Sequence, residues 1–386
     1  MKILFVIPSF RNGGTNTSLR NMVSMLPKNN NEFYVFAVTD EGPNKEFLSH
    51  YCTLLNPSGK TSDGNNTENN ALSHIAHWVK WVKKSLDKVG IDISPMVFKR
   101  VARGLQKHNF DLVVAFQEDT ATRFSSFFDK TRKIAWIRCD YSRYLTTPKI
   151  VSANRKIYSG FEKIVCVSNY TSEQFLTVLP ELRGKVTSLH NLINDDLIIS
   201  RSKDIVALPW DNEVFSIVSV GRFDKVKRFE HIPRIAAEIK KKCGIFKWVI
   251  IGGGNNNIKE TVKKALFEYN VTSEVILLGE INNPYPYIAN SNLLVCLSST
   301  EACPNVVNEA KILHVPVVAA DFGSVYEFLE DNHNGLISPI EQIGERISDL
   351  IINKEKYMYL KNNISSFKYD NNLIIERLMT EILKVN

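Results

Sequence analysis

The sequence predicts an α/β protein. Short apolar runs alternate with helix-length amphipathic segments along all 386 residues, which is typical of parallel strands joined by crossover helices. The series of apolar runs breaks off near residue 190 and resumes at Phe215. Because a chain of this length can bury two hydrophobic cores, we expect two domains, each with its own sheet.

Each predicted strand is a short apolar run bounded by polar or turn-forming residues. In the first half the predicted strands are residues 2–7, 33–39, 112–115, 133–137, 164–167 and 186–189. In the second half they are residues 215–220, 248–251, 275–278, 293–297 and 315–319.

The domain boundary is predicted within residues 195–212, a polar linker without sustained periodicity. It separates a first domain at 1–194 from a second at 213–366, and residues 367–386 are expected to form a C-terminal helix that returns to the first domain. Residues 56–70 are crowded with turn formers and predict an exposed loop. Two sheets joined in this way predict a cleft, and ligands of open α/β sheets bind beyond the carboxyl ends of the strands.

Composition excludes several classes of protein. No apolar run reaches the roughly 18 residues of a spanning helix, and the opening ten residues, broken by Pro8, are too short for a signal peptide, so we expect a cytoplasmic location. The six cysteines show neither C-x-x-C pairs nor zinc-ligand spacing, which predicts free, buried thiols.

Two strand ends carry candidate phosphate-binding residues. Gly13 and Gly14 lie between the first strand and a helix, where paired glycines let the backbone approach a phosphate, although a tight turn explains them equally well. Arg222 and Lys227 follow the first strand of the second half, and both cations can bind one diphosphate unless they are only solvated loop residues. The run Gly252–Gly254 predicts either a tight turn or a backbone cradle, because Asn257 occupies the third position of the dinucleotide fingerprint.

The stretch 298–310 is the most informative. Pro304 and a capping Asn305 predict a helix beginning near Val306, with Glu301 on the preceding loop and Glu309 in the first turns. The helix N-terminus suits a phosphate, and a carboxylate beside it can accept hydrogen bonds from sugar or ribose hydroxyls. The alternative is a capped helix whose acids stabilise only its own dipole.

Together these motifs resemble the retaining glycosyltransferases of family 4, which have the GT-B fold. The resemblance rests on the order of the motifs, which covers nearly the whole chain. They are G-G after the first strand, V-C-V-S at 165–168, H-N-L-I at 190–193, G-R-x4-K from Gly221, E-x7-E from Glu301, and P-V-V-A-x-D from Pro316.

The resemblance implies a GT-B enzyme with two Rossmann-like domains that transfers a sugar from a nucleotide diphosphate, most commonly UDP, with retention of configuration. Carried over by position, Arg222 and Lys227 neutralise the leaving diphosphate and Glu301 contacts the donor sugar. Glu309 holds the ribose hydroxyls. The backbone near Gly13 and Gly14 and near Pro304, Asn305 and Val306 adds contacts to the donor. No metal or cofactor is expected.

The sequence departs from the family at two places. Arg138 stands where many members have a histidine in a W-I-H-x-D segment, so the contact of that histidine with the donor sugar is in question and Asp140 is a further candidate. The loop after Glu301 reads Ala302-Cys303-Pro304 where glycines are common. Since Pro304 offers no N–H, the identity of the donor sugar does not follow from the sequence.

Positive charge is concentrated in residues 71–110. The chain carries a net charge of +7, and this stretch contains eight lysines and arginines and two aspartates. On a helical wheel Trp81, Lys84 and Lys88 share one face, which is suited to an anionic membrane or is simply a solvated basic face. No nucleic-acid recognition motif accompanies the charge.

The sequence thus predicts a glycosyltransferase that acts on a glycan or lipid-linked acceptor in bacterial cell-surface polysaccharide synthesis, in the cytoplasm or peripheral on the inner face of the plasma membrane. Two alternatives remain open. One is a sugar-nucleotide epimerase of GT-B fold, and the other is a non-catalytic subunit that binds the nucleotide sugar.

Overall fold

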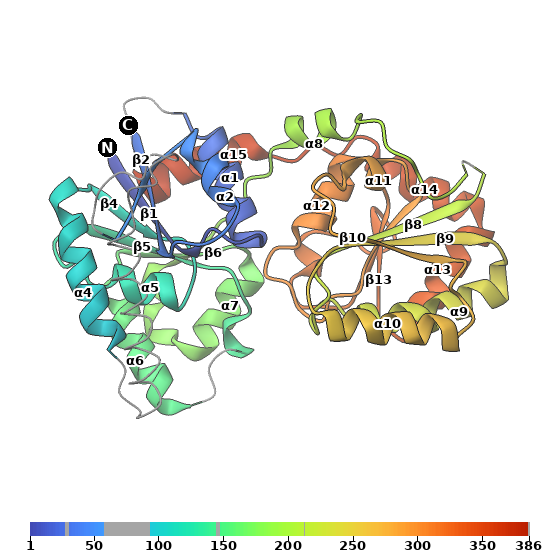
Figure 1. Cartoon of the computed structure of the whole chain (residues 1–386), viewed down its shortest axis with the longest axis horizontal. Helices are drawn as coiled ribbons and strands as arrows, with labels where there is room; N and C mark the ends of the chain where they lie inside the picture. Colours follow the sequence, from blue (N-terminus) through green and yellow to red (C-terminus); the bar gives the residue numbers. More distant parts are fainter. Residues whose placement is uncertain (28–30, 58–92, 144–146, 212, 385–386) are drawn as a thin grey trace, which may run out of the picture. The chain divides into compact units, whose positions relative to one another are not determined.

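The computed structural model describes residues 1–27, 31–57, 93–143, 147–211 and 213–384. The chain divides into two compact units, shown in Figure 1. Unit 1 comprises Met1–Leu192 and Asn371–Asn386, and unit 2 comprises Ile193–Asp370. Each unit is built on a parallel sheet, which confirms the predicted α/β class.

Unit 1 contains, in its described part, a seven-stranded parallel sheet of order β3-β2-β1-β4-β5-β6-β7. Its strands are β1 (Lys2–Ser9), β2 (Glu32–Thr39), β3 (Thr53–Leu55), β4 (Leu112–Ala115), β5 (Arg132–Ile137), β6 (Lys163–Cys166) and β7 (Val186–Ser188). Its helices are α1 (Gly14–Met25), α2 (Asn44–Ser49), α4 (Ser94–Leu105), α5 (Thr120–Ser125), α6 (Pro148–Ser159), α7 (Asn169–Val178) and α15 (Asn371–Arg377), which continues as a π-helix over Leu378–Leu383.

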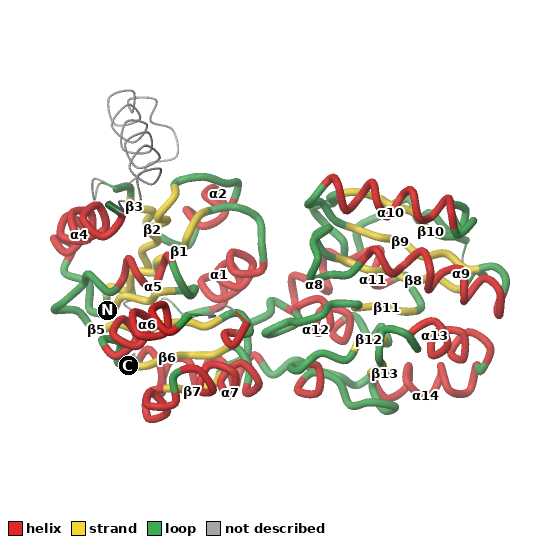
Figure 2. Tube along the Cα trace, turned by 90° about the horizontal axis from the view of Figure 1, so that it is seen from below, coloured by secondary structure: helices red, strands yellow, loops and turns green. Residues whose placement is uncertain are grey.

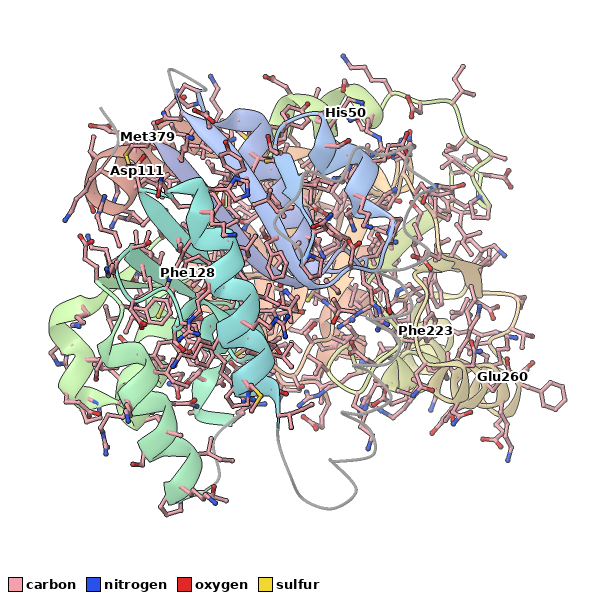
Figure 3. The ribbon with its side chains drawn as sticks, turned by 60° about the vertical axis from the view of Figure 1, so that its left-hand side comes forward. His50, Asp111, Phe128, Phe223, Glu260 and Met379 are labelled. Atoms are coloured by element: carbon pink, nitrogen blue, oxygen red, sulfur yellow. The ribbon has the colours of Figure 1, made fainter. Side chains whose placement is uncertain are left out.

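The sheet of unit 1 is covered by helices, so its central strands are apolar on both faces. Every residue of β4 is buried, as expected of a parallel strand between helix layers. The core under α4 and α5 is aromatic: Phe36 stacks on Phe124 with ring centroids 4.8 Å apart. Phe128, labelled in Figure 3, is fully buried in the same cluster.

Unit 2 contains a six-stranded parallel sheet of order β10-β9-β8-β11-β12-β13. Its strands are β8 (Phe215–Val220), β9 (Phe246–Ile251), β10 (Val275–Gly279), β11 (Leu293–Cys296), β12 (Val317–Ala320) and β13 (Gly335–Ser338). Its helices are α8 (Asp195–Arg201), α9 (Ile232–Cys243), α10 (Asn256–Glu268), α11 (Tyr285–Ala289), α12 (Asn305–Ile312), α13 (Ile343–Ile352) and α14 (Lys354–Ile364). Figure 2 shows the strands between their helices.

Two clusters of apolar side chains hold the helices of unit 2 to the sheet. Side chains of α9, α10 and α13 pack with Trp248 in one cluster, and side chains of α11 and α12 pack with Val249 in the other. Trp248 and Val249 are successive residues of β9, so they point to opposite faces of the sheet. The two clusters therefore lie on its two sides.

In both sheets the strand order reverses beside the first strand. In unit 1 the reversal lies between β1 and β4, and in unit 2 it lies between β8 and β11, which pair directly. At such a point the loops that follow the two neighbouring strands run in opposite directions. A crevice forms between these loops, and ligands of α/β proteins bind in it. The residues after β1, β4, β8 and β11 are therefore the first place to look for a site.

The structure corrects two details of the sequence prediction. Strands β3 and β13 were not predicted, because three and four residues beside turn formers give too little pattern. The stretch predicted as a linker, 195–212, instead begins with α8 and belongs to unit 2. The Asn194 side chain caps that helix by accepting a hydrogen bond from the Leu197 N–H, and Ile198 is buried against Ile193 and Ile312.

All six cysteines are free thiols, as predicted, but the predicted burial holds for only three of them, and the other three are partly exposed. Within the described residues no helix is long and apolar enough to cross a membrane. The predicted loop at 56–70 falls almost entirely outside the described residues, as does the part of the basic stretch 71–110 that precedes residue 93.

Candidate functional site

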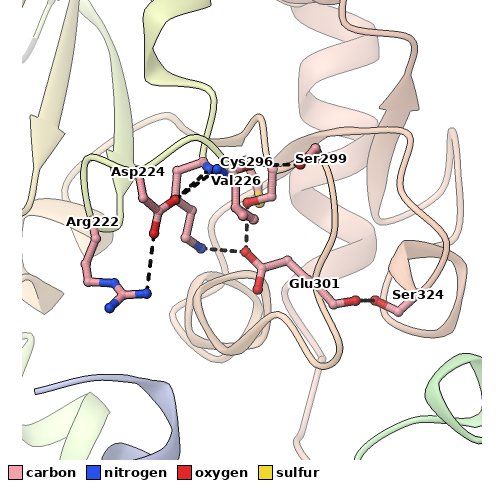
Figure 4. A network of polar contacts seen from close by, with 9 residues as sticks. Arg222, Asp224, Val226, Cys296, Ser299, Glu301 and Ser324 are labelled. Carbon is pink, nitrogen blue, oxygen red and sulfur yellow. Dashed lines mark hydrogen bonds and ion pairs between the residues drawn. The ribbon is translucent and has the colours of Figure 1, made fainter. Parts of the chain in front are cut away.

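The site in unit 2 is formed by the loops that follow β8 and β11. These strands are neighbours, so the residues after Val220 and after Cys296 meet at the carboxyl edge of the sheet although they are far apart in sequence. The backbone joins the two loops directly, because the Ser299 N–H donates to the Val226 carbonyl at 2.8 Å. Figure 4 shows this network.

An ion pair between Lys227 and Glu301 lies at the centre of the network. Lys227 Nζ is 2.5 Å from Glu301 Oε1, and the side chains are 21% and 19% exposed. The Ser298 hydroxyl donates to the same carboxylate oxygen at 2.7 Å, and the Ser324 hydroxyl donates to the Glu301 carbonyl. Burial lowers the pKa of Lys227, but Glu301, Cys296 and Asp224 together more than offset this effect, and the pKa is raised. Lys227 is therefore a positively charged side chain that the Glu301 carboxylate holds in place on one side.

Asp224 fixes the backbone that carries Lys227. Its Oδ1 accepts hydrogen bonds from the Val226 and Lys227 N–H groups, both at 3.0 Å, which is the turn geometry that aspartate favours. Its other oxygen lies 3.4 Å from Arg222 Nη2, and the Arg222 side chain is 70% exposed. Arg222 thus lies at the rim of the site, whereas Lys227 lies inside it.

The glycines of these loops allow close approaches between neighbouring segments. A Cβ on Gly221 would lie 3.0 Å from Lys227 Cε, so the lysine stem passes directly over this glycine. A Cβ on Gly252 would lie 1.7 Å from the Gly221 carbonyl oxygen, and Gly252 has a φ of 153°. The run at 252–254 is therefore explained by close backbone packing, in favour of the tight-turn interpretation.

Helix α12 begins beside the Lys227–Glu301 pair. It starts at Asn305, with Pro304 rather than the predicted Asn305 in the capping position, and no described side chain caps it. Pro304 is buried, and Val306 packs against the core of unit 2. If this helix end binds a ligand, these residues contribute backbone groups and the helix dipole rather than their side chains.

Glu309 lies on the first turns of α12 and is half-buried. Among the described residues, its carboxylate has no hydrogen bond or ion-pair partner. Burial raises the pKa of Glu309 to about 7, and the nearby charge of Lys227 opposes that rise. The structure thus brings Lys227, Glu301 and Glu309 close together beside the start of α12.

In unit 1, Gly13 and Gly14 lie at the start of α1. A Cβ on either residue would meet no described atom within 4 Å, and Gly13 is in extended backbone that any residue can adopt. Neither packing within the described chain nor backbone strain requires glycine at these two positions. Open space over a helix N-terminus is instead what a phosphate-containing ligand needs.

Arg138 is held by other groups of unit 1. Its Nε donates to the Phe116 carbonyl and its Nη1 donates to Asn191 Oδ1, both at 2.8 Å. The guanidinium also lies 3.9 Å from the centre of the Phe116 ring. Arg138, which stands at the position of the family's histidine, is thus held in one orientation by two hydrogen bonds and by the Phe116 ring.

Asp140, the other candidate of this segment, is 5% exposed. Its carboxylate accepts hydrogen bonds from the Ser142 hydroxyl at 2.6 Å and the Tyr170 hydroxyl at 3.0 Å, and it pairs with Arg143 at 3.1 Å. These contacts explain Asp140 as a residue that fixes the loop after β5.

The prediction from sequence missed the residues that orient the site. Asp224, Ser298 and Ser324 hold Lys227 and Glu301, and Glu118 accepts a hydrogen bond from the Arg138 N–H at 2.8 Å. The one sequence signal available was Asp224, an aspartate two residues before Val226 in a strand-end loop, which is typical of a side-chain turn.

The comparison with known proteins finds a family that is similar to the second unit. Residues 200–367 match the family described as "Glycosyl transferases group 1". Most of unit 2 is thus similar to this family of glycosyltransferases. The narrower assignment to family 4 stays a prediction.

Two curated glycosyltransferases are similar to part of this chain. An O-antigen biosynthesis glycosyltransferase of Escherichia coli is 25% identical over 213 residues, which cover 52% of this chain and 59% of the relative. The N-acetylgalactosamine-N,N'-diacetylbacillosaminyl-diphospho-undecaprenol 4-alpha-N-acetylgalactosaminyltransferase of Campylobacter jejuni is 32% identical over 211 residues, which cover 51% of this chain and 55% of the relative. The chain thus spans little more than half the length of these two relatives.

Solved structures extend the similarity to the whole chain. HepE of Anabaena in complex with UDP-glucose matches with a TM-score of 0.74 and 16% identity, covering 100% of both chains. Such a likeness concerns the fold. The chain has the GT-B fold, as predicted, with two Rossmann-like units.

Proposed function

We propose that this protein is a retaining glycosyltransferase that moves a sugar from a nucleotide diphosphate, most commonly UDP, to a glycan or lipid-linked acceptor without a metal ion. The observation that carries the proposal is the cluster of Lys227, Glu301 and Glu309 beside the start of α12, within a unit similar to the group 1 glycosyltransferases.

The physical role of the cluster follows from where charge develops. As the glycosidic bond of the donor loosens, negative charge accumulates on the diphosphate. A preorganised ammonium and a helix N-terminus stabilise that state more than the ground state. In this proposal Lys227 binds the diphosphate, and the exposed Arg222 adds a second cation at the rim. The same charge is what a divalent metal would otherwise neutralise.

In this proposal the carboxylates of Glu301 and Glu309 accept hydrogen bonds from hydroxyl groups of the donor. Glu301 is already oriented by Ser298 and by Lys227, so its free oxygen is available to a sugar hydroxyl, and Glu309 is available to the ribose. In unit 1, the open space over Gly13 and Gly14 adds backbone contacts to the donor. Arg138 and Asp140 serve mainly to fix the loop after β5.

The proposed pathway is bacterial cell-surface polysaccharide synthesis. The names of the two curated relatives, one an O-antigen enzyme and one acting on a diphospho-undecaprenol-linked sugar, support it. The proposal includes a cytoplasmic location, peripheral on the inner face of the membrane, with residues 71–110 as the anionic-lipid contact. Vesicle flotation tests this contact: preference for anionic over neutral lipids supports it, and equal recovery contradicts it.

The decisive experiment incubates the full chain with a panel of UDP-, GDP- and ADP-sugars, with and without glycan and polyprenyl-diphosphate acceptors. We expect donor hydrolysis or transfer in the presence of EDTA, and a product whose anomeric configuration by NMR matches the donor. An inverted product would contradict retention, loss of activity in EDTA would contradict metal independence, and epimerised donor would show an epimerase instead.

Lys227→Ala and Glu309→Ala test the site. Removing a preorganised charge contact costs on the order of 10²-fold or more in turnover, so both variants should lose at least that much. Lys225→Ala is the matched control, because this exposed lysine lies two residues away and has the same charge. Near wild-type turnover of both Lys227→Ala and Glu309→Ala would contradict the proposed role of these residues in binding the donor.

A further inference from the structure

Unit 1 contains a cavity that none of the residues discussed so far, apart from Glu118, helps to form. Its volume is about 560 Å³, within the usual range for small-molecule sites. The walls come from α4, α5 and α6, and the base comes from the turn after β4, next to the point where the strand order of the sheet reverses. The cavity thus lies at the edge of the sheet where ligands of α/β folds bind.

The lining combines two kinds of surface. Phe98, Phe127 and Tyr141 supply aromatic faces, and Glu118, Asp119 and Asn154 supply hydrogen-bonding groups. A sugar ring offers the matching pair of surfaces, because its C–H faces pack on aromatic rings and its hydroxyls bond to carboxylates and amides.

Glu118 gives the base of the cavity a fixed acceptor. Its side chain is buried, with 5% exposure, and its Oε2 accepts a hydrogen bond from the Arg138 N–H at 2.8 Å. The Cys139 thiol makes a further hydrogen bond to it. A buried carboxyl group held in this way keeps one geometry, which is what recognition of a particular hydroxyl requires.

Asp119, which follows Glu118 in the lining of the cavity, has a strained backbone. It has a φ of 60° and a ψ of −107°, a conformation that costs a non-glycine residue on the order of 1–3 kcal/mol. Its side chain is exposed and does not cap α5. Within the described residues, its carboxylate makes no hydrogen bond or ion pair that would favour this conformation. Such strain is concentrated at functional sites.

The other chemistries fit less well. An isoprenoid chain offers no hydrogen-bond donor to the Asp119 carboxylate of the lining, and covering a charged group without a partner is costly. A phosphate group would face the carboxylates of both Glu118 and Asp119, with Arg123 as the cation of the lining. An uncharged sugar has neither problem.

We infer that this cavity binds a sugar ring of the acceptor, with Glu118 and Asp119 as hydroxyl-binding residues. The role of acceptor rests on the proposed glycosyl transfer, whereas sugar binding by the cavity does not.

The test uses a variant in which a larger side chain fills the cavity and none of the proposed hydroxyl-binding residues is changed. Ala153, an exposed residue of α6, lines the cavity, and the neighbouring Ser152 is exposed and does not. Ala153→Trp should therefore block the cavity, and Ser152→Trp is its matched control. Binding of methyl α- and β-glycosides of glucose, galactose, N-acetylglucosamine and N-acetylgalactosamine to the full chain is measured by saturation-transfer NMR, with UDP at saturation.

We expect at least one glycoside to bind, Ala153→Trp to abolish the signal, and Ser152→Trp to keep it. Asp119→Gly should weaken that binding at least fivefold without lowering the melting temperature, because glycine relieves the strain. The inference is overturned if no glycoside binds, if Ala153→Trp leaves binding unchanged, or if farnesol displaces the glycoside and binds in its place.

Donor hydrolysis without acceptor separates this result from the proposed function. Ala153→Trp should retain hydrolysis while losing transfer to acceptor at least tenfold. If Ala153→Trp retains both donor hydrolysis and transfer to acceptor, the proposed acceptor site is contradicted and the proposed glycosyltransferase activity is not. If the wild-type protein turns over no donor but glycosides bind to it and not to Ala153→Trp, the proposed glycosyltransferase activity is contradicted and sugar binding by the cavity is supported.

Discussion

At the scale of single residues, the Lys227 side chain depends on a glycine and an aspartate that do not touch the substrate in our proposal. The lysine stem lies over Gly221, and the turn that presents it is closed by Asp224. Its ammonium group is then fixed by Glu301, 74 residues later in the chain. A cation held at both ends loses little freedom when a diphosphate binds.

We predict that Gly221→Ala reduces turnover about tenfold with little change in stability. The added methyl group would lie 3.0 Å from Lys227 Cε, which is close enough to displace a flexible side chain but not the backbone. Steady-state kinetics and thermal unfolding of the same preparation measure both effects. Unchanged kinetics would show that the position of Lys227 is not critical.

Glu309 should make stability depend on pH. Burial raises its folded-state pKa to about 7, above the ordinary value of a glutamate, so the folded protein binds more protons than the unfolded chain between about pH 4.5 and 7. The contribution of this group to stability is therefore present at low pH and is lost as the pH rises through that window.

The variant Glu309→Gln lacks this dependence. Going from about pH 5 to about pH 8, the free energy of unfolding of wild type should fall by about 1–2 kcal/mol more than that of the variant. Urea unfolding of both proteins at the two pH values measures the difference. Parallel pH profiles would mean that Glu309 is not buried enough to shift its pKa.

At the scale of elements, side-chain caps decide where several helices begin. Ser168, in the V-C-V-S segment, is fully buried, and its Oγ accepts a hydrogen bond from the Thr171 N–H at 3.0 Å. It therefore fixes the turn between β6 and α7. The corresponding end of α12 has no side-chain cap among the described residues, in keeping with a role in ligand binding.

Ser168→Ala should lower the free energy of unfolding by about 1–2 kcal/mol, because a buried cap and its hydrogen bonds are lost. Thr147→Ala is the matched comparison: it also removes a cap, but Thr147 is exposed and its bond to Ile150 is 3.4 Å long. The second variant should cost less than half as much. Equal costs in chemical denaturation would contradict the importance of burial.

At the scale of the whole molecule, the chain returns to unit 1 at its end. Residues Asn371–Asn386 belong to that unit. Leu378, Ile382 and Leu383 are buried, and Arg377 donates to the Ser188 carbonyl at 3.1 Å. The C-terminal segment thus packs into the first unit, although it follows the second unit in the sequence.

Deleting residues 371–386 should therefore destabilise unit 1 selectively. We expect amide hydrogen exchange to become faster across the strands β5–β7 and to stay unchanged across the sheet of unit 2, because local stability follows local burial. Hydrogen exchange followed by mass spectrometry distinguishes the two sheets. Equal acceleration in both would show that the units do not unfold separately.

The local sequence was sufficient for most strands and for the candidate cluster. Runs such as Phe215–Val220 are apolar throughout because a parallel strand is covered on both faces, so the fold class and most strand positions follow from local pattern. The motifs around Lys227 and Glu301 were found because they follow such strands. Short strands such as β3 and β13 were missed, since a few residues carry too little periodicity.

The tertiary structure decided what local pattern does not encode. The pairing of β8 with β11 places Lys227 against Glu301. The packing of Phe116 and Asn191 around Arg138 fixes the side chain that stands at the position of the family's histidine. The burial of Glu118, and the cavity that it lines, likewise depend on helices far apart in sequence. By itself the sequence determined which residues follow which strands, because burial selects residue types locally. Only the folded chain determined which of those residues meet, because strand order and side-chain packing are properties of the whole unit.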